Sequence, residues 1–212
     1  MNFLFDGPQD APVTVLFAHG AGAPMDSPSL EATVKAFAER GLRVARFEFG
    51  HMAARRKGTR RPPPRAEALE PEYLAVVDAL AAPGRLVIGG KSMGGRVASM
   101  VAEVLYAERK IAGLLCLGYP FHPPSKPHQL RTQHLLNLTV PTLICQGTRD
   151  EFGAVEEVPG YLLPQSIEIL WLEDGDHDLT PRKKLSGHTK AEHLDRVADR
   201  VAEWAQGLAA RG

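Results

Sequence analysis

Residues 85–99 constrain the fold of this chain more than any other part of its sequence. They read R-L-V-I-G-G-K-S-M-G-G-R-V-A-S. Residues 86–88 form a short apolar run bounded by glycines, which is typical of a strand buried on both faces. From Arg96 onward, apolar residues recur three and four positions apart, as they do on one face of a helix. The chain therefore turns sharply from a strand into a helix at residues 90–94.

This turn matches the pattern G-x-S-x-G, with Ser92 at its centre. Glycines on both sides of the serine let the strand and the helix approach closely while the serine adopts a cramped backbone conformation. The Ser92 hydroxyl then projects above the sheet, beside the free N–H groups of the helix N-terminus. We interpret the turn as a nucleophile elbow and predict that Ser92 is a catalytic nucleophile.

The turn allows two other interpretations. A phosphate-binding loop of the form G-x-x-x-x-G-K-S requires glycine at position 85, where the sequence has Arg85, and the residues between read as a strand. Nucleotide binding is therefore disfavoured. Ser92 could also be an ordinary turn residue, because G-x-S-x-G occurs by chance. The strand–turn–helix setting favours the nucleophile over this second interpretation.

Strands and helices alternate along the rest of the 212-residue chain. Helices are predicted at 27–41, at 71–82, from 96 onward, and after the capping box formed by Thr189 and Glu192. Strands are predicted at 3–5, 13–18, 44–49, 86–88, 113–117, 141–147 and 167–172. This alternation predicts an α/β fold with a doubly wound, mostly parallel sheet flanked by helices, in a single domain spanning residues 1–212.

Composition excludes several classes of function. Lys and Arg number 25 and Asp and Glu number 25, so net charge indicates neither a nucleic-acid nor a membrane partner. No apolar run approaches the length that spans a bilayer. There is no C-x-x-C pair and no histidine pair at metal-site spacing, so we predict no metal. Cys116 and Cys145 lie in apolar runs, which is typical of reduced thiols in a cytoplasmic protein.

Candidate partners for Ser92 follow later strands. In an open parallel sheet, functional groups collect beyond the carboxyl ends of the strands. Asp150 follows the strand at 141–147, and His177 follows the strand at 167–172. The order serine, acid, histidine is that of the α/β-hydrolases. An imidazole can take the serine proton near neutral pH, and a carboxylate holds the ring in the required tautomer. We predict that His177 is the base and Asp150 the acid.

Other carboxylates lie near these candidates. Glu151 and Asp174 remain open as alternatives for the acid. Asp176 and Asp178 are too close to His177 along the chain to reach the far nitrogen of its ring easily, so we expect them to shape its loop.

An oxyanion hole needs two backbone N–H groups. We predict that one belongs to Met93, directly after the nucleophile. The other should come from the segment H-G-A-G at residues 19–22, and Ala21 is the chosen donor. His19 is expected to brace this loop rather than to act as a base.

Residues 50–66 are predicted to form a basic loop that leaves the same edge of the sheet. It contains Arg55, Arg56, Lys57, Arg60, Arg61 and Arg65 and no acidic residue. The simplest interpretation is a solvated loop. The alternative is that Arg60 and Arg61, with Lys91 and Lys126, attract an anionic substrate. We expect the substrate site to include His19, Gly22, Tyr119, Lys91, Arg60 and Arg61.

The sequence also resembles a family of small α/β-hydrolases. The motifs that carry the resemblance are L-F-A-H-G-A-G-A-P-M-D-S-P at 16–28, G-G-K-S-M-G-G-R at 89–96, L-G-Y-P-F-H-P-P at 117–124, P-T-L-I-C-Q-G-T-R-D at 141–150 and G-D-H-D-L at 175–179. Many members are called dienelactone-hydrolase-like, and others are testis-expressed proteins or the hydrolase-like subunit of a histone-acetyltransferase complex. The resemblance implies the hydrolase fold and a triad of Ser92, Asp150 and His177. It does not indicate a substrate.

Many relatives of this fold carry a helical lid between the strands predicted at 113–117 and 141–147. Here the intervening residues 119–138 are short and rich in proline, with room for one helix near 133–137. We therefore expect no substantial lid and an open site that suits small substrates.

The leading functional hypothesis is a cytoplasmic serine hydrolase that cleaves an ester or thioester of a small molecule and needs no cofactor. The competing hypothesis is a non-catalytic protein-interaction domain that has kept the hydrolase scaffold. The set of Ser92, Asp150 and His177 favours catalysis, since a binding scaffold has no physical need for all three.

Overall fold

A seven-stranded sheet forms the centre of the computed structural model, which describes residues 2–59 and 62–210. The spatial order of the strands is β1-β3-β2-β4-β5-β6-β7. All neighbouring pairs are parallel except β1 with β3. The strands are β1 (Leu4–Asp6), β2 (Val13–Ala18), β3 (Arg43–Phe47), β4 (Arg85–Lys91), β5 (Gly113–Leu117), β6 (Thr142–Gly147) and β7 (Ile167–Leu172). The predicted doubly wound, mostly parallel sheet is confirmed.

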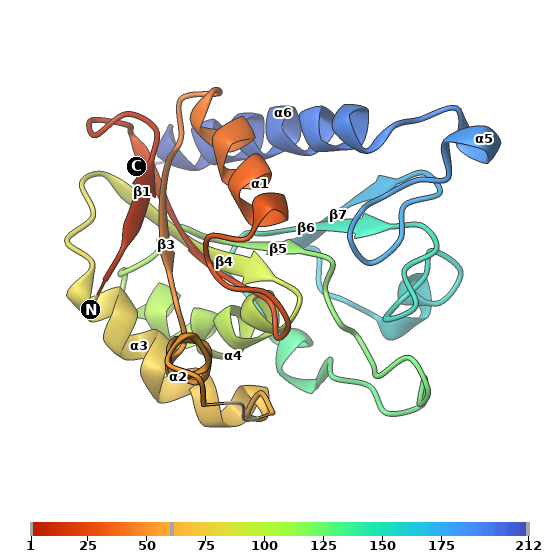
Figure 1. The fold of residues 1–212 in the computed structure, drawn as a ribbon, viewed down its shortest axis with the longest axis horizontal. Helices are drawn as coiled ribbons and strands as arrows, with labels where there is room; N and C mark the ends of the chain where they lie inside the picture. Colours follow the sequence, from red (N-terminus) through yellow and green to blue (C-terminus); the bar gives the residue numbers. More distant parts are fainter. Residues whose placement is uncertain (1, 60–61, 211–212) are drawn as a thin grey trace.

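Helices cover both faces of this sheet (Figure 1). One layer contains α1 (Pro28–Ala38) and α6 (Lys190–Ala209), which pack against each other. The opposite layer contains α2 (Gly50–Arg56), α3 (Glu70–Ala79) and α4 (Met93–Ala107). Each layer encloses its own cluster of buried apolar side chains against the sheet. The predicted capping box starts α6, where the Thr189 side chain and the Glu192 side chain each bond the other's backbone N–H.

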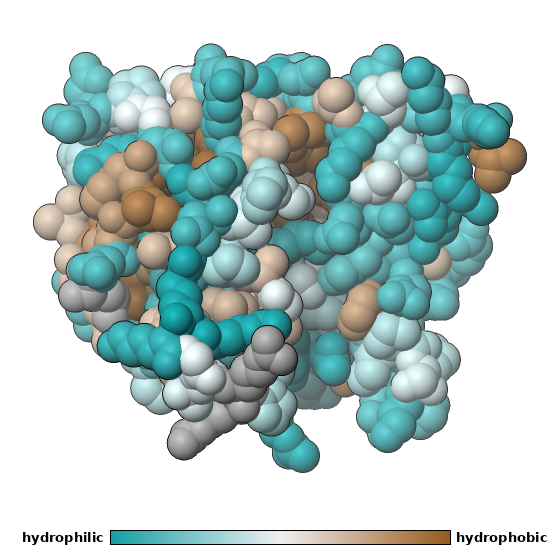
Figure 2. All heavy atoms as spheres, viewed as in Figure 1, coloured by the Kyte–Doolittle hydropathy of each residue, from teal (hydrophilic) through white to brown (hydrophobic). Residues whose placement is uncertain are grey.

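Most of the face seen in Figure 2 is hydrophilic, with a hydrophobic area over the edge strand β1. Leu4 and Phe5 of this strand are 36% and 49% exposed, and the Arg43 guanidinium lies 4.6 Å from the centre of the Phe5 ring. A charged side chain over an edge strand hinders pairing with another sheet. Within the part of the chain that the structure describes, no helix combines the length and the apolar character needed to cross a bilayer.

Two segments differ from the predicted elements. Residues 50–56 form helix α2, where a loop was predicted over 50–66. The basic composition of this segment suggested a loop, but Met52 within it is buried. The first helical N–H, that of Gly50, donates a hydrogen bond of 2.6 Å to the Glu72 carboxylate. The prediction of a helix near 133–137 was also inexact, because only a 3₁₀ turn, η2 (Gln133–Leu135), forms there.

No α-helix forms between β5 and β6, which agrees with the prediction of no substantial lid. Three further short elements were not predicted: η1 (Ala66–Leu69), η3 (Val158–Tyr161) and α5 (Lys183–Ser186).

The turn between β4 and α4 has the backbone of an elbow. Ser92 has φ 51° and ψ −116°, a region that residues with a Cβ atom rarely adopt. Its N–H donates to the carbonyl of Leu117 at 2.9 Å, which ties the turn to the end of β5. A Cβ atom placed on Gly90 would lie 2.7 Å from the backbone carbon of Gly94, and one on Gly94 would lie 2.5 Å from the His19 oxygen. Glycine is therefore required at both positions for α4 to pack this closely.

The strain at Ser92 leads to a stability prediction. Ser92→Gly should unfold with a free energy about 1 kcal/mol higher than Ser92→Ala, because glycine enters positive φ freely while alanine keeps the strain. Chemical denaturation of the two variants measures the difference. Ser99, inside α4, is the control position, where Ser99→Gly should be about 1 kcal/mol less stable than Ser99→Ala. If Ser92→Gly proved less stable than Ser92→Ala, the strained elbow would be contradicted.

Candidate active site

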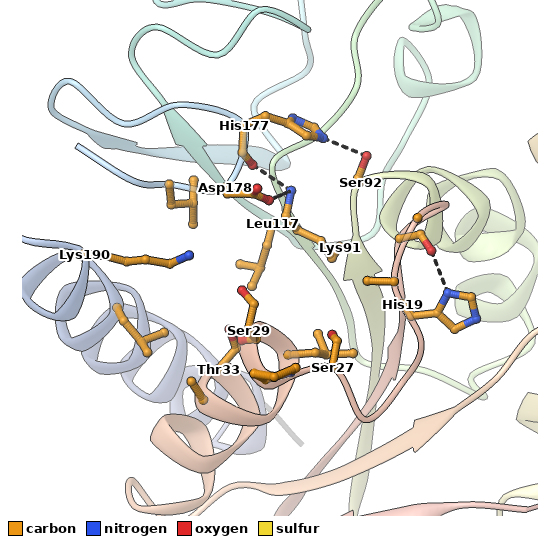
Figure 3. Close-up of a pocket in the computed structure, with 18 of the residues that line it drawn as sticks. His19, Ser27, Ser29, Thr33, Lys91, Ser92, Leu117, His177, Asp178 and Lys190 are labelled. Atoms are coloured by element: carbon orange, nitrogen blue, oxygen red, sulfur yellow. Dashed lines mark hydrogen bonds and ion pairs between the residues drawn. The ribbon is translucent and has the colours of Figure 1, made fainter. Parts of the chain in front are cut away.

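The structure brings Ser92, His177 and Asp150 together at the carboxyl edge of the sheet. Figure 3 shows the contact between Ser92 and His177. Ser92 lies between β4 and α4, Asp150 follows β6, and His177 follows β7. His177 Nε2 is 2.8 Å from Ser92 Oγ, and His177 Nδ1 is 2.9 Å from Asp150 Oδ2. With Nδ1 donating to the carboxylate, Nε2 carries the lone pair that can accept the serine proton. The three side chains therefore form a continuous hydrogen-bonded chain.

Asp150 is fully buried, and three donors meet its carboxylate. Besides His177, these are the Gln146 side-chain amide at 2.9 Å and the Phe152 N–H at 2.9 Å. Buried carboxylates need such partners, because an unpaired buried charge is costly. The same Gln146 amide also bonds the backbone of Tyr119 and Gly153, so it joins the acid to two neighbouring loops.

The other carboxylates that the sequence left open as the acid point elsewhere. Glu151 is exposed. Asp174 pairs with Arg182 and Arg149, and the Arg182 hydrogen bond lowers the pKa of Asp174 to about 2. Asp176 accepts hydrogen bonds from the N–H groups of Asp178 and Thr180, both at 2.9 Å. Asp176 therefore shapes the histidine loop.

His177 is held from its face as well as from its two nitrogens. The Phe152 ring lies 4.2 Å from the imidazole, centre to centre, at an interplanar angle of 35°. Beneath the loop, a Cβ atom on Gly147 would lie 2.2 Å from the Gly175 oxygen, so the end of β6 and the histidine loop touch through their backbones. The orientation of the imidazole therefore depends on main-chain packing.

The predicted oxyanion donors lie on two segments that face Ser92. Met93 is the first residue of α4, where backbone N–H groups have no partner within the helix. Ala21 and Gly22 line the cavity beside Ser92. Within residues 2–59 and 62–210, neither the Met93 nor the Ala21 N–H donates a backbone hydrogen bond outside regular elements. Both groups are therefore available to an oxygen bound near Ser92.

His19 holds the glycine-rich segment in place. Its Nε2 accepts a hydrogen bond of 3.1 Å from the Phe49 N–H, so its Nδ1 must carry the proton, which it donates to the Gly20 carbonyl at 2.6 Å. Burial lowers the pKa of His19, which keeps the ring neutral. His19 also lines the cavity, and its bonds are those of a brace.

The cavity next to Ser92 has a volume of about 540 Å³ and lies between α1 and α6. The exposed lining of the cavity is largely apolar, and its polar side chains include Lys91 and Lys190. Apolar lining residues include Leu30, Ala32, Leu117, Phe152, Leu179, Leu194 and Val197. This volume suits a small organic group.

Several residues predicted for the substrate site lie elsewhere. Tyr119 is fully buried and does not line the cavity, because its hydroxyl bonds Ser99 and its ring packs on Phe121. Arg56 is held by Glu48 and Asp26 and so anchors α2 to the loop after β2. Arg60 and Arg61 lie outside the described residues. The remaining basic side chains of this group, Arg55, Lys57, Arg65 and Lys126, do not line the cavity.

A second serine and histidine also meet in the structure. Ser99 Oγ lies 2.8 Å from His134 Nε2, but Ser99 is only 2% exposed and its hydroxyl donates to the Arg96 carbonyl at 2.7 Å. Burial, with a smaller effect of the Arg96 charge, lowers the pKa of His134 to about 4. Among the described residues, no carboxylate bonds the His134 ring. This pair therefore lacks access, an orienting acid and a ring basic enough for catalysis, and we assign it to packing.

Two side chains around His177 were not anticipated from the sequence. Gln146 is the single amide in the apolar run of β6, and a polar residue at that position was a signal that could have been noticed. Phe152 carries no such signal, because nothing in its local sequence distinguishes an aromatic residue that packs on an imidazole. The described part of the chain contains no group of three His, Cys, Asp or Glu residues placed to hold a metal ion.

Known structures share this architecture at low sequence identity. Est1E from Butyrivibrio proteoclasticus aligns with a TM-score of 0.70 and 17% identity, covering 98% of this chain and 94% of that one. A dienelactone hydrolase from Anabaena variabilis aligns with a TM-score of 0.67 and 19% identity, covering 95% of this chain and 89% of that one. A serine hydrolase without lid from Xanthomonas campestris aligns with a TM-score of 0.68 and 18% identity, covering 96% of this chain and 87% of that one. These likenesses confirm the predicted fold.

Family membership comes from the sequence itself. A model of the alpha/beta hydrolase domain matches residues 11–206, which include all three members of the serine–histidine–aspartate chain. The resemblance to small α/β-hydrolases is thereby confirmed. This chain belongs to the alpha/beta hydrolase domain family.

Proposed function

We propose that the protein is a serine hydrolase that cleaves an ester or thioester of a small molecule. The observation that carries this proposal is the hydrogen-bonded chain from Ser92 Oγ through His177 to the buried Asp150 carboxylate. A serine hydroxyl is a weak nucleophile until a base takes its proton. The three hydrogen-bonded side chains supply that base, His177, and the acid that orients it, Asp150. Serine acyl transfer requires no cofactor.

In the proposed reaction, Ser92 Oγ attacks the carbonyl carbon while His177 Nε2 takes the hydroxyl proton. The resulting tetrahedral oxyanion accepts hydrogen bonds from the Met93 and Ala21 N–H groups. The imidazolium then gives its proton to the departing alkoxide or thiolate, which leaves an acyl group on Ser92. Water repeats the sequence and releases the acid, with Asp150 ionised throughout.

The cavity suggests the size and character of the substrate. A space of about 540 Å³ with mostly apolar walls accommodates a compact aliphatic or aromatic group on one side of the scissile bond. The short segment between β5 and β6 leaves the site open. We therefore propose small esters or thioesters as substrates, rather than long lipids.

Two broader proposals accompany this function. Residues 1–212 act as one domain, which is supported by the single sheet that both helical layers cover. The protein works in the cytoplasm, which is supported by Cys116 and Cys145, two free buried thiols on neighbouring strands.

The nucleophile assignment is tested with a fluorophosphonate probe. Wild type should be labelled, and Ser92→Ala should not. Ser99→Ala is the matched control and should be labelled at the wild-type rate, because Ser99 is buried beside a weakly basic histidine. Hydrolysis of a reactive ester should fall by about 10⁴–10⁶ in Ser92→Ala. A protein that the probe never labels, and that cleaves none of a panel of esters, would support the interaction-domain alternative.

The acid assignment is tested by a pair of adjacent substitutions. Asp150→Asn should lower kcat by about 10²–10⁴, because an amide can hold His177 in the wrong tautomer. Glu151→Gln should have little effect, since the Glu151 side chain is exposed. Steady-state kinetics with one activated ester measures both, and circular dichroism verifies folding. The assignment fails if Glu151→Gln causes the large loss and Asp150→Asn does not.

A further inference from the structure

The residue before the nucleophile, Lys91, makes contacts that the proposed reaction leaves unexplained. It ends β4, and its side chain lies in the wall of the cavity, only 20% exposed (Figure 3). Burial of a lysine is unfavourable unless its ammonium group finds partners. Burial lowers the pKa of Lys91, and the neighbouring Asp178 carboxylate opposes this effect.

The partners of the ammonium group belong to the histidine loop. Lys91 Nζ donates to the backbone carbonyl of His177 at 2.6 Å and lies 3.3 Å from Asp178 Oδ1. Other bonds of this loop use residues on either side of His177, such as the Arg149 N–H to the Gly175 carbonyl at 3.1 Å and the Arg149 side chain to the Thr180 carbonyl at 3.0 Å. Within residues 2–59 and 62–210, the Lys91 bond is the hydrogen bond that holds the main chain of His177 itself.

The end of β5 is shaped to admit this contact. Gly118 has φ 60°, and a Cβ atom there would lie 2.6 Å from the His177 oxygen and 2.9 Å from Lys91 Nζ. Any side chain at position 118 would therefore press on the very atoms that form the bond. Gly118 itself is fixed by its N–H, which donates to the Cys145 carbonyl at 2.9 Å. The Lys91 ammonium group, which extends from the end of β4, thus lies between the end of β5 and the loop after β7.

We propose that Lys91 is a positioning residue that fixes the main chain of His177 relative to Ser92. Lys91 and Ser92 are consecutive in sequence, so the Lys91 backbone is fixed relative to the nucleophile. The Lys91 ammonium group bonds the main chain of His177, the proposed base. The distance of 2.8 Å between Ser92 Oγ and His177 Nε2 is then set through the backbone as well as through Asp150. This inference rests on the proposed serine hydrolase function, and it deepens the account of that site.

The test uses a neutral ester, because such a substrate has no anionic group that Lys91 could bind. Lys91→Met should lower kcat by about 10- to 100-fold, because a misplacement of about 1 Å is enough for such a loss. KM should stay within about threefold, since substrate binding is not removed. Lys110→Met is the matched control, because Lys110 also pairs with acidic side chains but lies on the surface away from the site, and it should retain full kcat.

Chemical rescue separates positioning from a general effect of the substitution. In Lys91→Cys, alkylation with 2-bromoethylamine builds a side chain of nearly the length of lysine and restores its ammonium group. Cys116 and Cys145 are fully buried, and burial raises the pKa of both thiols, so they should not react in the folded protein. Activity should return after treatment, whereas treated wild type should not change.

Hydrogen–deuterium exchange provides a readout that is independent of catalysis. Exchange should rise in the peptide covering residues 173–180 in Lys91→Met and stay unchanged over residues 190–209. If the wild-type protein cleaves no ester, the proposed function is contradicted. The hydrogen–deuterium exchange measurement still tests the role of Lys91 in that case. The inference is overturned if exchange at 173–180 is unaltered, if an active enzyme keeps its kcat in Lys91→Met, or if the loss appears in KM alone.

Discussion

The close packing of helix α4 against the end of strand β4 is the constraint on which the site depends. Neither Gly90 nor Gly94 has space for a Cβ atom, and Ser92 between them is forced to positive φ. This single turn places the Ser92 hydroxyl at the sheet edge, next to the first residue of α4, Met93. Strain of this kind costs about 1–3 kcal/mol and persists only where surrounding structure enforces it.

His177 and Asp150 are brought to Ser92 through a second set of backbone contacts. Gly147 touches the histidine loop at Gly175, and Gly118 leaves room for the bond from Lys91 to the His177 carbonyl. Surface charges contribute little to this arrangement, because exposed ion pairs are weak. The geometry of the site therefore depends on how the strand ends pack as well as on side-chain contacts such as that from Gln146 to Asp150.

Much of this arrangement could be predicted from sequence because it depends on local signals. The G-x-S-x-G turn, the apolar strand runs and the order of Ser92, Asp150 and His177 are all visible in the chain. Helix α2 was missed, since its basic composition and the prolines after it suggested a loop, while the acceptor for its first N–H, Glu72, lies far away in sequence.

The sequence could not reveal contacts made by the fold itself. Tyr119 follows β5 at the functional edge, as a substrate-binding residue would, but its ring turns into the core. Lys91 lines the cavity, as a substrate-binding residue would, but nothing in the sequence indicated that it also bonds the backbone of a residue 86 positions away. Conversely, the contact between Ser99 and His134 shows that a close serine–histidine pair needs access and an acid before it can be a site.

In the proposed reaction, Ser92 becomes acylated during each turnover. The most direct measurement is rapid acid quenching of the protein during turnover of p-nitrophenyl acetate, followed by peptide mass mapping. We expect an acetyl group on the peptide that contains Ser92, which should be absent from Ser92→Ala and should accumulate when deacylation is slowed. Acetylation confined to another residue, or undiminished hydrolysis by Ser92→Ala, would contradict it.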